Sequence, residues 1–420
     1  MKYFFLFTLL MTMLGIAIGH LPDRSVRPPF DMHDQLVDIT GSHAFALPGH
    51  GSVRGPCPAL NALANHRYIS HDGVTNFDEA RDAVIKGKSL RLVFALDAGV
   101  VEYILWQALA ASGSADMWTL SIGGRHPRTD RNVTYPLKLR THGLSSTHVG
   151  FESDASPTRS DLYDSENPNA VDLDRDAFKI LYNRQANVTD DEADYNLQVV
   201  TDHRFNRTLY SIQNNTAMFL TPLNSVMGSA TYLFIANLFA NHSAAKPSGR
   251  LDRETLKSFY GVSGDPNGNA TWLTGAERIP ANWYRRHSSV PLTVQDINEQ
   301  TKYMYQQYPD LLDRYLVGGN ANGTADNWVS VDVEKLSGGN VTLDSIRKGT
   351  NEPNCFMIAS APDFGSPFLE KLYKDAGPVK KLLDDKMAPL VQALKCPPAF
   401  PVDYTLFDEL KGWGNSLKLK

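Results

Sequence analysis

Few cysteines occur in this chain of 420 residues, and several features that would mark a nucleic-acid or membrane protein are missing. Its three cysteines include no CxxC pair, the usual motif of a redox thiol with a resolving partner. No cluster of Lys and Arg accompanies aromatic residues, so no nucleic-acid partner is expected. The net charge of −5 is spread along the chain, and the hydrophobic fraction of 42% is typical of a globular enzyme or binding protein.

An apolar segment begins the sequence. Met1 and Lys2 precede seventeen uncharged, mostly apolar residues, which end in the small-x-small triplet AIG at position 19. This layout predicts a signal peptide over residues 1–19, with an uncleaved membrane anchor as the alternative. Because no later stretch is apolar enough to cross a bilayer, we expect a secreted, extracellular protein with no stable membrane span after signal cleavage.

Asn-x-Ser/Thr triplets without proline at the middle position occur eight times. Behind a signal peptide they predict N-glycosylation at some of these sites and mark surface loops. The candidate asparagines are Asn132, Asn187, Asn206, Asn214, Asn241, Asn269, Asn322 and Asn340.

An odd number of cysteines in an oxidising compartment leaves one thiol without an intramolecular partner. Cys355 and Cys396 are 41 positions apart, whereas Cys57 lies almost 300 residues upstream. The economical pairing is therefore Cys355 with Cys396, which would stabilise the fold by about 4 kcal/mol on the chain-entropy estimate. Cys57 is then the free thiol.

Helical patterns dominate the chain from Cys57 onward, with few alternating strand patterns and no internal repeat. The pattern predicts a mostly α fold with long loops and little β structure, and the length allows one large domain or two ordinary ones. Residues 20–56 are expected to be an irregular N-terminal wrap, 320–354 a polar, glycosylated, exposed insertion, and 401–420 a C-terminal tail. Helices are expected to begin at Pro58, to follow a cap at Thr75 or Asn76, and to cover 90–112, 161–182, 190–206, 224–241, 251–260, 293–316 (a pair) and 368–394.

The free thiol lies in the stretch GPCPALNALANHRY, residues 55–68, at the mouth of an apolar run that begins at Pro58. At a helix start, unpaired N–H groups and the helix dipole favour the thiolate. Three functions fit such a thiol: a nucleophile, a redox group or a ligand to a soft metal centre; a buried inert thiol is the plain alternative. His66 lies about two and a half helical turns away, too far to serve as its base.

This stretch resembles the proximal segment of the fungal haem-thiolate peroxidases, the chloroperoxidase and unspecific-peroxygenase family. The motifs SIGG at 121–124, THVGFESDAS at 147–156, YNL at 195–197 and IANLF at 235–239 resemble later segments of the family in the same order. The resemblance covers roughly residues 45–400. It implies a single large helical domain of the chloroperoxidase type over residues 20–400, built around a buried haem b, with Cys57 as the axial iron ligand. The Cys355/Cys396 pair is similar to the C-terminal disulfide of the longer members.

The resemblance also implies a Mg²⁺ or Mn²⁺ ion beside a haem propionate. Carried over residue by residue, its ligands are the Glu152 carboxylate, the backbone carbonyl of Ser153 and the Ser156 hydroxyl; oxygen ligands suit such hard cations. The alternative is that Asp154 and Ser156 cap a helix running through Asp161.

One catalytic group of the family is not matched. Members carry a distal glutamate shortly before the ANLF-like helix, but residues 214–239, which include Gly228-Ser229, contain no Asp, Glu, His, Lys or Arg. Acid–base help contributes about 10²- to 10⁴-fold to catalysis, so reduced or atypical activity is possible. Substitute acids are His148, His203 and Glu254, each with a structural role as its alternative. An apolar distal pocket is expected to be lined by Met218, Phe219, Leu220, Leu223, Val226, Met227, Phe234 and Phe239. The alternative is that these residues only form the core between helices.

The sequence therefore predicts a secreted haem-dependent peroxidase or peroxygenase that uses hydrogen peroxide to oxidise a small organic substrate. The first alternative is a haem-binding family member with weak or no peroxidase activity, or one that acts on a specialised metabolite. The second is a secreted binding glycoprotein that holds no haem.

Overall fold

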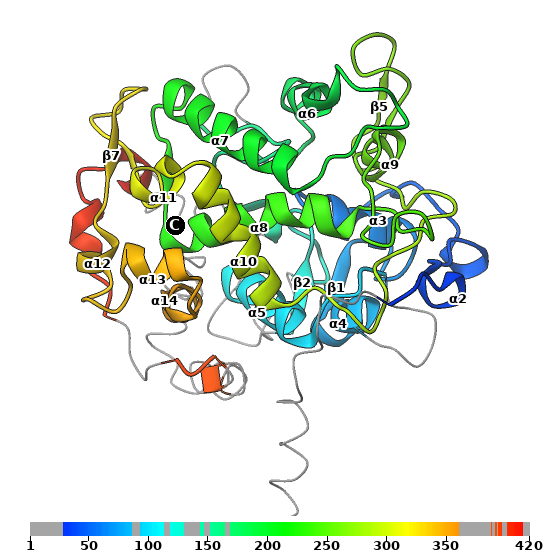
Figure 1. Cartoon of the computed structure of the whole chain (residues 1–420), viewed down its shortest axis with the longest axis horizontal. Coiled ribbons are helices and arrows are strands. Elements are labelled where there is room, and N and C mark those ends of the chain that lie inside the picture. The colour runs from blue at the N-terminus through cyan, green and yellow to red at the C-terminus, as the bar shows by residue number, and fades with distance from the viewer. Residues whose placement is uncertain are drawn as a thin grey trace, which may run out of the picture.

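The computed structural model describes residues 28–85, 93–112, 118–129, 143–146, 152–163, 169–360, 388, 391–392, 394–396 and 401–414. Helices predominate in this part of the chain (Figure 1), which confirms the expected mostly α fold. The signal peptide, most of the expected 368–394 helix, Asn132 and His148 lie outside the described residues. The helices are α2 (Met32–Gln35), α3 (Pro58–Asn65), α4 (Phe77–Ile85), α5 (Ala98–Ser112), α6 (Arg175–Tyr182), α7 (Leu197–Asn214), α8 (Pro222–Leu238), α9 (Arg253–Phe259), α10 (Val294–Gln307), α11 (Asp310–Asp313), α12 (Val333–Leu336), α13 (Leu343–Lys348) and α14 (Glu352–Ser360).

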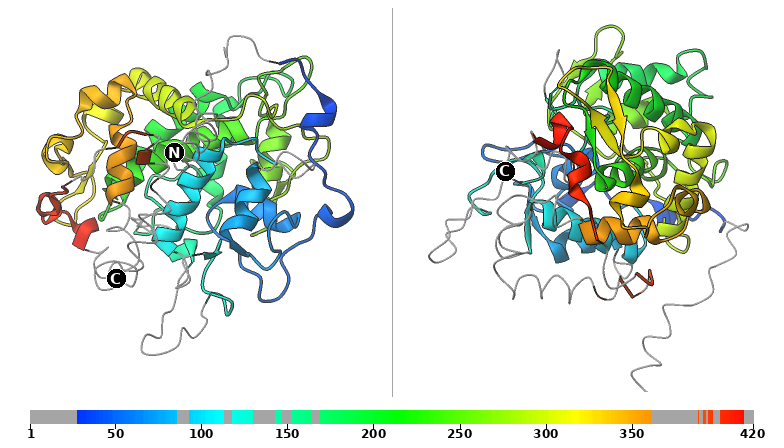
Figure 2. Two further views of the ribbon diagram at one scale, coloured as in Figure 1. Left: turned by 90° about the horizontal axis from the view of Figure 1, so that it is seen from below. Right: turned by 90° about the vertical axis from the view of Figure 1, so that its left-hand side faces the viewer.

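α8 crosses the middle of the molecule, and α7, α10 and α14 pack against it (Figures 1 and 2). The helix begins sharply because Thr221 and Asn224 form a capping box and Pro222 occupies the first turn. No charged residue occurs between Pro222 and Leu238, so the helix can be enclosed on several sides. It lies close to the expected range 224–241.

Two large apolar clusters fill the interior. One joins α3, α4, α5 and α9 to part of α8, and the other joins the opposite end of α8 to α14 and the 404–413 segment. Residues 320–354 were expected to be exposed, but Val333, Leu336 and Val341 are buried in the second cluster. This range therefore belongs to the folded body, because its short helices α12 and α13 turn apolar side chains inward.

β structure is limited to short antiparallel pairs, as expected. β1 pairs with β2, β3 with β6 and β6 with β7, and β4 with β5. The strands are β1 (Val74–Asn76), β2 (Thr119–Ser121), β3 (Phe219–Leu220), β4 (Val262–Ser263), β5 (Thr271–Trp272), β6 (Gly318–Asn320) and β7 (Trp328–Ser330).

Three helix starts differ from the expected ranges. α5 begins at Ala98 rather than near 90, because Asp97 accepts a hydrogen bond from the Gly99 N–H at 2.9 Å and so caps the helix. α6 begins at Arg175 rather than at 161, after a cap by Asp174. α7 begins at Leu197 rather than at 190, after a cap by Asn196. In each case, a side-chain cap inside the apolar pattern sets the boundary.

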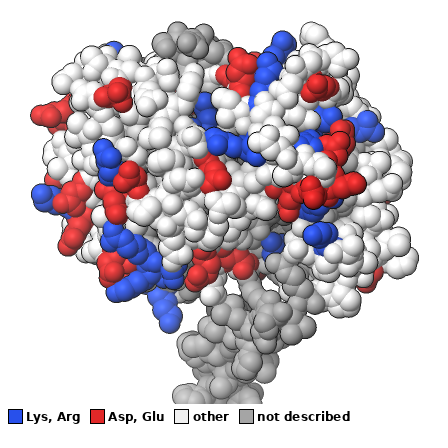
Figure 3. All heavy atoms as spheres, turned by 45° about the horizontal axis from the view of Figure 1, so that its top comes forward, with Lys and Arg blue, Asp and Glu red and all other residues white. Residues whose placement is uncertain are grey.

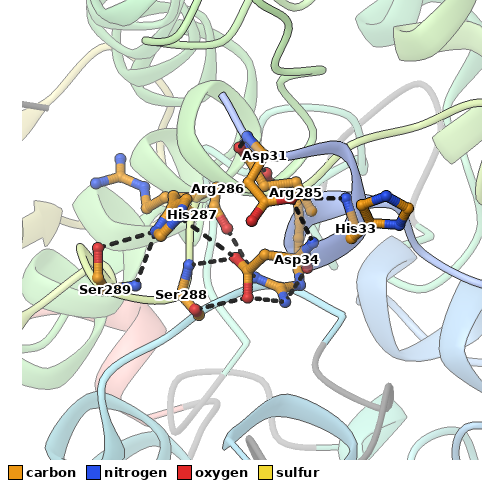
Figure 4. A network of polar contacts seen from close by, with 9 residues as sticks. Asp31, His33, Asp34, Arg285, Arg286, His287, Ser288 and Ser289 are labelled. Carbon is orange, nitrogen blue, oxygen red and sulfur yellow. Dashed lines mark hydrogen bonds and ion pairs between the residues drawn. The ribbon is translucent and has the colours of Figure 1, made fainter. Parts of the chain in front are cut away.

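The N-terminal segment is mostly irregular and is held to the body by a polar network around Asp34, shown in Figure 4. Asp34 accepts hydrogen bonds from the Ser288 N–H at 3.0 Å and from the Ser288 hydroxyl at 2.7 Å. Its Oδ1 also lies 3.4 Å from Nη2 of Arg285, which is itself buried. This network joins α2 to a segment 250 residues later.

Cys355 and Cys396 form the expected disulfide.

Among the described helices, none is long and apolar enough to cross a membrane. Acidic and basic side chains lie in small groups on the face shown in Figure 3. The seven sequon asparagines within the described ranges are all exposed or partly exposed, and their glycosylation remains a prediction.

Candidate functional site

Cys57 is free and partly buried, and it occupies the N-cap of α3. Its backbone is extended (φ −89°, ψ 109°), and Pro58 takes the first helical position, as the sequence predicts. The sulfur therefore stands at a fixed place beside the first turn of the helix.

Asn61 fixes the turn that carries Cys57. Its Oδ1 accepts from the Gly55 N–H at 3.0 Å, and its Nδ2 donates to the Gly55 carbonyl at 2.9 Å. Gly55 must be glycine, because an added Cβ would lie 1.8 Å from the Ile122 carbonyl oxygen. The backbone before Cys57 is therefore held from both sides, by α3 and by the strand that ends at Ser121.

The next polar residues of α3 join it to residues 275–279. Asn65 Nδ2 donates to the carbonyls of Gly275 and Glu277, both at 2.8 Å, and His66 Nε2 accepts from the Ile279 N–H at 3.2 Å. Burial lowers the pKa of His66 to about 4. His66 is therefore a neutral structural residue, in agreement with its exclusion as a base.

A buried ion pair lies beside this turn. Arg159 Nη2 is 3.5 Å from Glu277 Oε1, which also accepts from Asn61 Nδ2 at 2.8 Å. Burial raises the pKa of Glu277, and the positive charge of Arg159 opposes that shift. Arg159 Nε and Glu277 Oε2 have no hydrogen-bond partner in the described chain, and both residues line a cavity of about 70 Å³ together with Asn61 and Tyr260. Arg159 and Glu277 were not identified from the sequence.

Opposing effects act on the pKa of the Cys57 thiol. Burial has the largest effect and raises the pKa, while the N–H groups of Leu60 and Ala59 and the charge of Arg159 lower it. The helix start thus favours the thiolate as expected, but burial outweighs it. A thiol with a raised pKa is a poor nucleophile and a poor redox group. A metal ion removes the proton of a coordinating thiol outright, so the ligand hypothesis fits this environment best.

Residues 152–156 form a tight turn. Ala155 has a positive φ of 56°, and its N–H donates to Asp161 Oδ1 at 2.9 Å while its carbonyl accepts from the Tyr232 hydroxyl at 2.8 Å. The Glu152 carbonyl accepts from Asn224 Nδ2 at 3.2 Å. These bonds keep a non-glycine residue in a conformation that is costly elsewhere, a kind of strain that concentrates at functional sites.

The helix-cap alternative for this segment is wrong. Asp154 Oδ2 accepts from the backbone N–H of Phe219 at 3.2 Å, and no helix starts between 152 and 163. The described residues contain no group of three or more His, Cys, Asp or Glu side chains that could hold a metal ion.

The two substitute acids within the described residues, His203 and Glu254, have structural roles. His203 is fully buried, its Nε2 is hydrogen-bonded to the Pro157 carbonyl at 2.7 Å, and burial lowers its pKa to about 3. Glu254 is exposed and pairs with Lys257 at 2.7 Å. The expected apolar pocket residues divide among three separate core clusters, which favours the helix-core interpretation for most of them.

Arg204 on α7 is the functional candidate that the sequence did not reveal. It is 4% exposed, and its Nη1 lies 3.1 Å from the point where a Cβ on Gly228 would stand; Ser153 Oγ is 3.5 Å from the same point. A guanidinium group thus fills the space beside Gly228, in a helix that carries no acidic or basic side chain of its own. The arginine could have been noticed only as a charge among the buried positions of a helix.

Similarity to known proteins extends over most of the chain. Residues 43–288 match the model of the family described as "Peroxidase, family 2", a range that contains Cys57, residues 152–156, Arg204 and Glu277. The dothistromin biosynthesis peroxidase of Dothistroma septosporum is 32% identical over 390 residues, which cover 92% of this chain and 88% of the relative.

Two further relatives are similar. The aromatic peroxidase of Fusarium equiseti is 29% identical over 404 residues, covering 91% of this chain and 87% of the relative. The aromatic peroxygenase of Cyclocybe aegerita is 30% identical over 242 residues, covering 57% of this chain and 61% of that enzyme.

Proposed function

Because this chain belongs to peroxidase family 2, the fungal haem-thiolate peroxidases, we propose that Cys57 binds the iron of haem b as its axial ligand. The protein is an oxidoreductase that acts on peroxide, as its relatives are. The observation that carries the proposal is the free Cys57 at the start of α3, whose turn is held by Asn61 and bordered by the Arg159–Glu277 pair.

The described residues suit a thiolate-bound haem. Haem supplies the oxidising chemistry when bound, and a thiolate ligand donates electron density that favours cleavage of the peroxide O–O bond. The chain's own part is to hold the sulfur in place and to tune its charge: Arg159 favours the anion, and Glu277 disfavours it. Burial and the N–H groups of α3 affect the thiol more strongly than this pair does, so the pair adjusts the charge of the sulfur and does not set it alone.

A divalent cation is the finer part of the proposal. Glu152, the carbonyl of Ser153 and the hydroxyl of Ser156 would bind Mg²⁺ or Mn²⁺, hard ions that take oxygen ligands. Support comes from the turn at Ala155, which Asp161 and Tyr232 hold in its positive-φ conformation.

The substrate is proposed to be a small aromatic compound of specialised metabolism, oxidised by a secreted enzyme. Two of the relatives are named for aromatic substrates and one for dothistromin biosynthesis. A second candidate is a haem protein that cleaves peroxide slowly. The observation in its favour is that α8 carries no acidic or basic side chain and that His203 and Glu254 are engaged elsewhere.

The ligand assignment is tested by spectroscopy on full-length protein expressed with ample haem. We expect a strongly red-shifted Soret band for the ferrous–CO adduct of the wild type, its loss in Cys57→Ala and a changed ligand type in Cys57→His. An unchanged spectrum in Cys57→Ala, or a protein that purifies without any Soret band, refutes the assignment. Phenol turnover no faster than that of free haemin would favour the second candidate.

A further inference from the structure

Arg204 carries a buried positive charge that the described chain leaves unneutralised. Its one hydrogen bond within the described residues runs from Nη2 to the Ser225 carbonyl at 3.5 Å, and its Nε has no partner. That carbonyl already accepts from the Ser229 hydroxyl at 2.8 Å. No carboxylate of the described residues forms an ion pair with Arg204.

Such a group is costly to bury. A guanidinium cannot lose its proton in a protein, and an isolated buried charge costs several kcal/mol unless a counter-charge accompanies it. The described residues supply no such counter-charge, so a bound anion would stabilise this arrangement.

The surroundings of Arg204 indicate what kind of anion fits. The guanidinium lies 5.6 Å from the ring centroid of Tyr232. Burial lowers the pKa of Arg204, and the nearby Tyr305 and Tyr232 oppose that shift. Tyr305 belongs to the second apolar cluster together with Leu223 and Met227. A positive charge among aromatic and aliphatic groups suits a ligand with a charged end and an apolar body, and the planar guanidinium suits the two oxygens of a carboxylate.

The space for the guanidinium is provided by Gly228. A Cβ at this position would stand 3.1 Å from Nη1 of Arg204 and 3.5 Å from Ser153 Oγ. Glycine in the middle of a helix is less stable than alanine, so its presence in α8 is explained by the room it leaves. The glycine and the arginine thus form one arrangement that places a charge next to the 152–156 segment.

We propose that Arg204 binds the carboxylate or phenolate group of the organic substrate and thereby selects anionic aromatic compounds. This inference rests on the proposed function, since it assigns the substrate class of the same site. A haem propionate is the other source of the same chemistry. The proposed cation at Glu152 and Ser156 already supplies positive charge for a propionate, so the substrate is the better match for a second cation.

The test is calorimetry of full-length protein, with and without haem, using benzoate and its neutral counterpart benzamide. We expect Arg204→Met to weaken benzoate binding ten- to a hundredfold, the usual loss for a hydrogen bond to a charged group, and to change benzamide binding less than twofold. Gly228→Ala keeps the charge but crowds Nη1, and should weaken benzoate three- to tenfold. Arg314→Met, which removes an exposed arginine elsewhere, should change neither.

Three outcomes overturn the inference: wild type that does not bind benzoate, Arg204→Met that binds it unchanged, or benzoate binding that disappears when haem is present. In the last case, a loss of affinity in Arg204→Met for haemin but not for haemin dimethyl ester would identify a propionate as the partner. The proposed function is tested by a separate measurement. If Cys57 does not bind haem iron, the thiolate spectrum will be absent, whereas benzoate binding to the haem-free protein still tests the role of Arg204. Circular dichroism shows whether Arg204→Met is folded, and Gly228→Ala keeps the test decisive where it is not.

Discussion

Arg204 and Arg207 lie one turn apart on α7, and each is 4% exposed. Arg207 is fully engaged: it donates to the Ser156 carbonyl at 3.1 Å and the Arg159 carbonyl at 3.2 Å, and it lies 3.8 Å from Asp161. The Arg204 side chain has one hydrogen bond of 3.5 Å, a contact with the Tyr232 ring, and no carboxylate partner in the described chain. Equal burial therefore does not mean equal roles. Arg207 completes the structure, whereas Arg204 requires a ligand.

The same contrast separates the two ends of the candidate site. Beside Cys57, Arg159 forms an ion pair with Glu277. Beside Gly228, Arg204 has no carboxylate partner among the residues that the structure describes. We interpret the Arg159–Glu277 pair as a structural support for the thiol and Arg204 as a substrate-binding residue.

The largest effect is expected from Arg207→Met. This change leaves Asp161 buried without its cation and removes two hydrogen bonds to backbone carbonyls, and breaking a buried pair costs about 3–5 kcal/mol. The free energy of unfolding in urea, measured on haem-free protein at pH 7, should fall by that amount. A loss below about 1 kcal/mol would show that Arg207 is no better paired than Arg204.

Arg204→Met should act in the opposite direction on the same haem-free protein. Methionine fills a similar volume without a charge, and replacement of buried charges by apolar side chains is often stabilising, by about 1–4 kcal/mol. We therefore expect the urea midpoint to rise without a change in slope. A destabilisation as large as that of Arg207→Met would mean that Arg204 is satisfied within the protein, and the comparison would fail.

The sequence predicts the start of α3 and its free thiol well, because Pro58, the apolar spacing and the parity of the cysteines are local or countable features. It does not reveal Glu277, which meets Asn61 across 216 positions of sequence. Long-range pairs of this kind depend on the tertiary fold, and no periodicity records them.

The helix boundaries fail for a related reason. An apolar pattern indicates that a helix is present, but the start is set by one side-chain cap, such as Asp174 for α6. Arg204 was overlooked because an arginine is expected at the surface, and in the sequence alone a buried one looks the same. Functional residues that contradict the local pattern therefore become visible only once burial and partners are known.

The smallest effect concerns Asp161, the carboxylate that distinguishes Arg207 from Arg204. Burial and the neighbouring Asp154 raise its pKa to about 6, against the opposing charge of Arg207. Because this value lies above that of an unfolded aspartate, the stability contributed by the protonated form is fully present below about pH 4 and is lost as the pH rises through 6. Urea denaturation should therefore show that the difference in free energy of unfolding between wild type and Asp161→Asn falls as the pH rises from 5 to 7. Taking this difference removes the opposite contribution of His66 and His203, whose lowered pKa values make stability rise with pH in both proteins. The difference between wild type and the control Asp176→Asn, at an exposed position paired with Lys179, should stay constant, and a constant difference for Asp161→Asn would show that Arg207 holds Asp161 ionised.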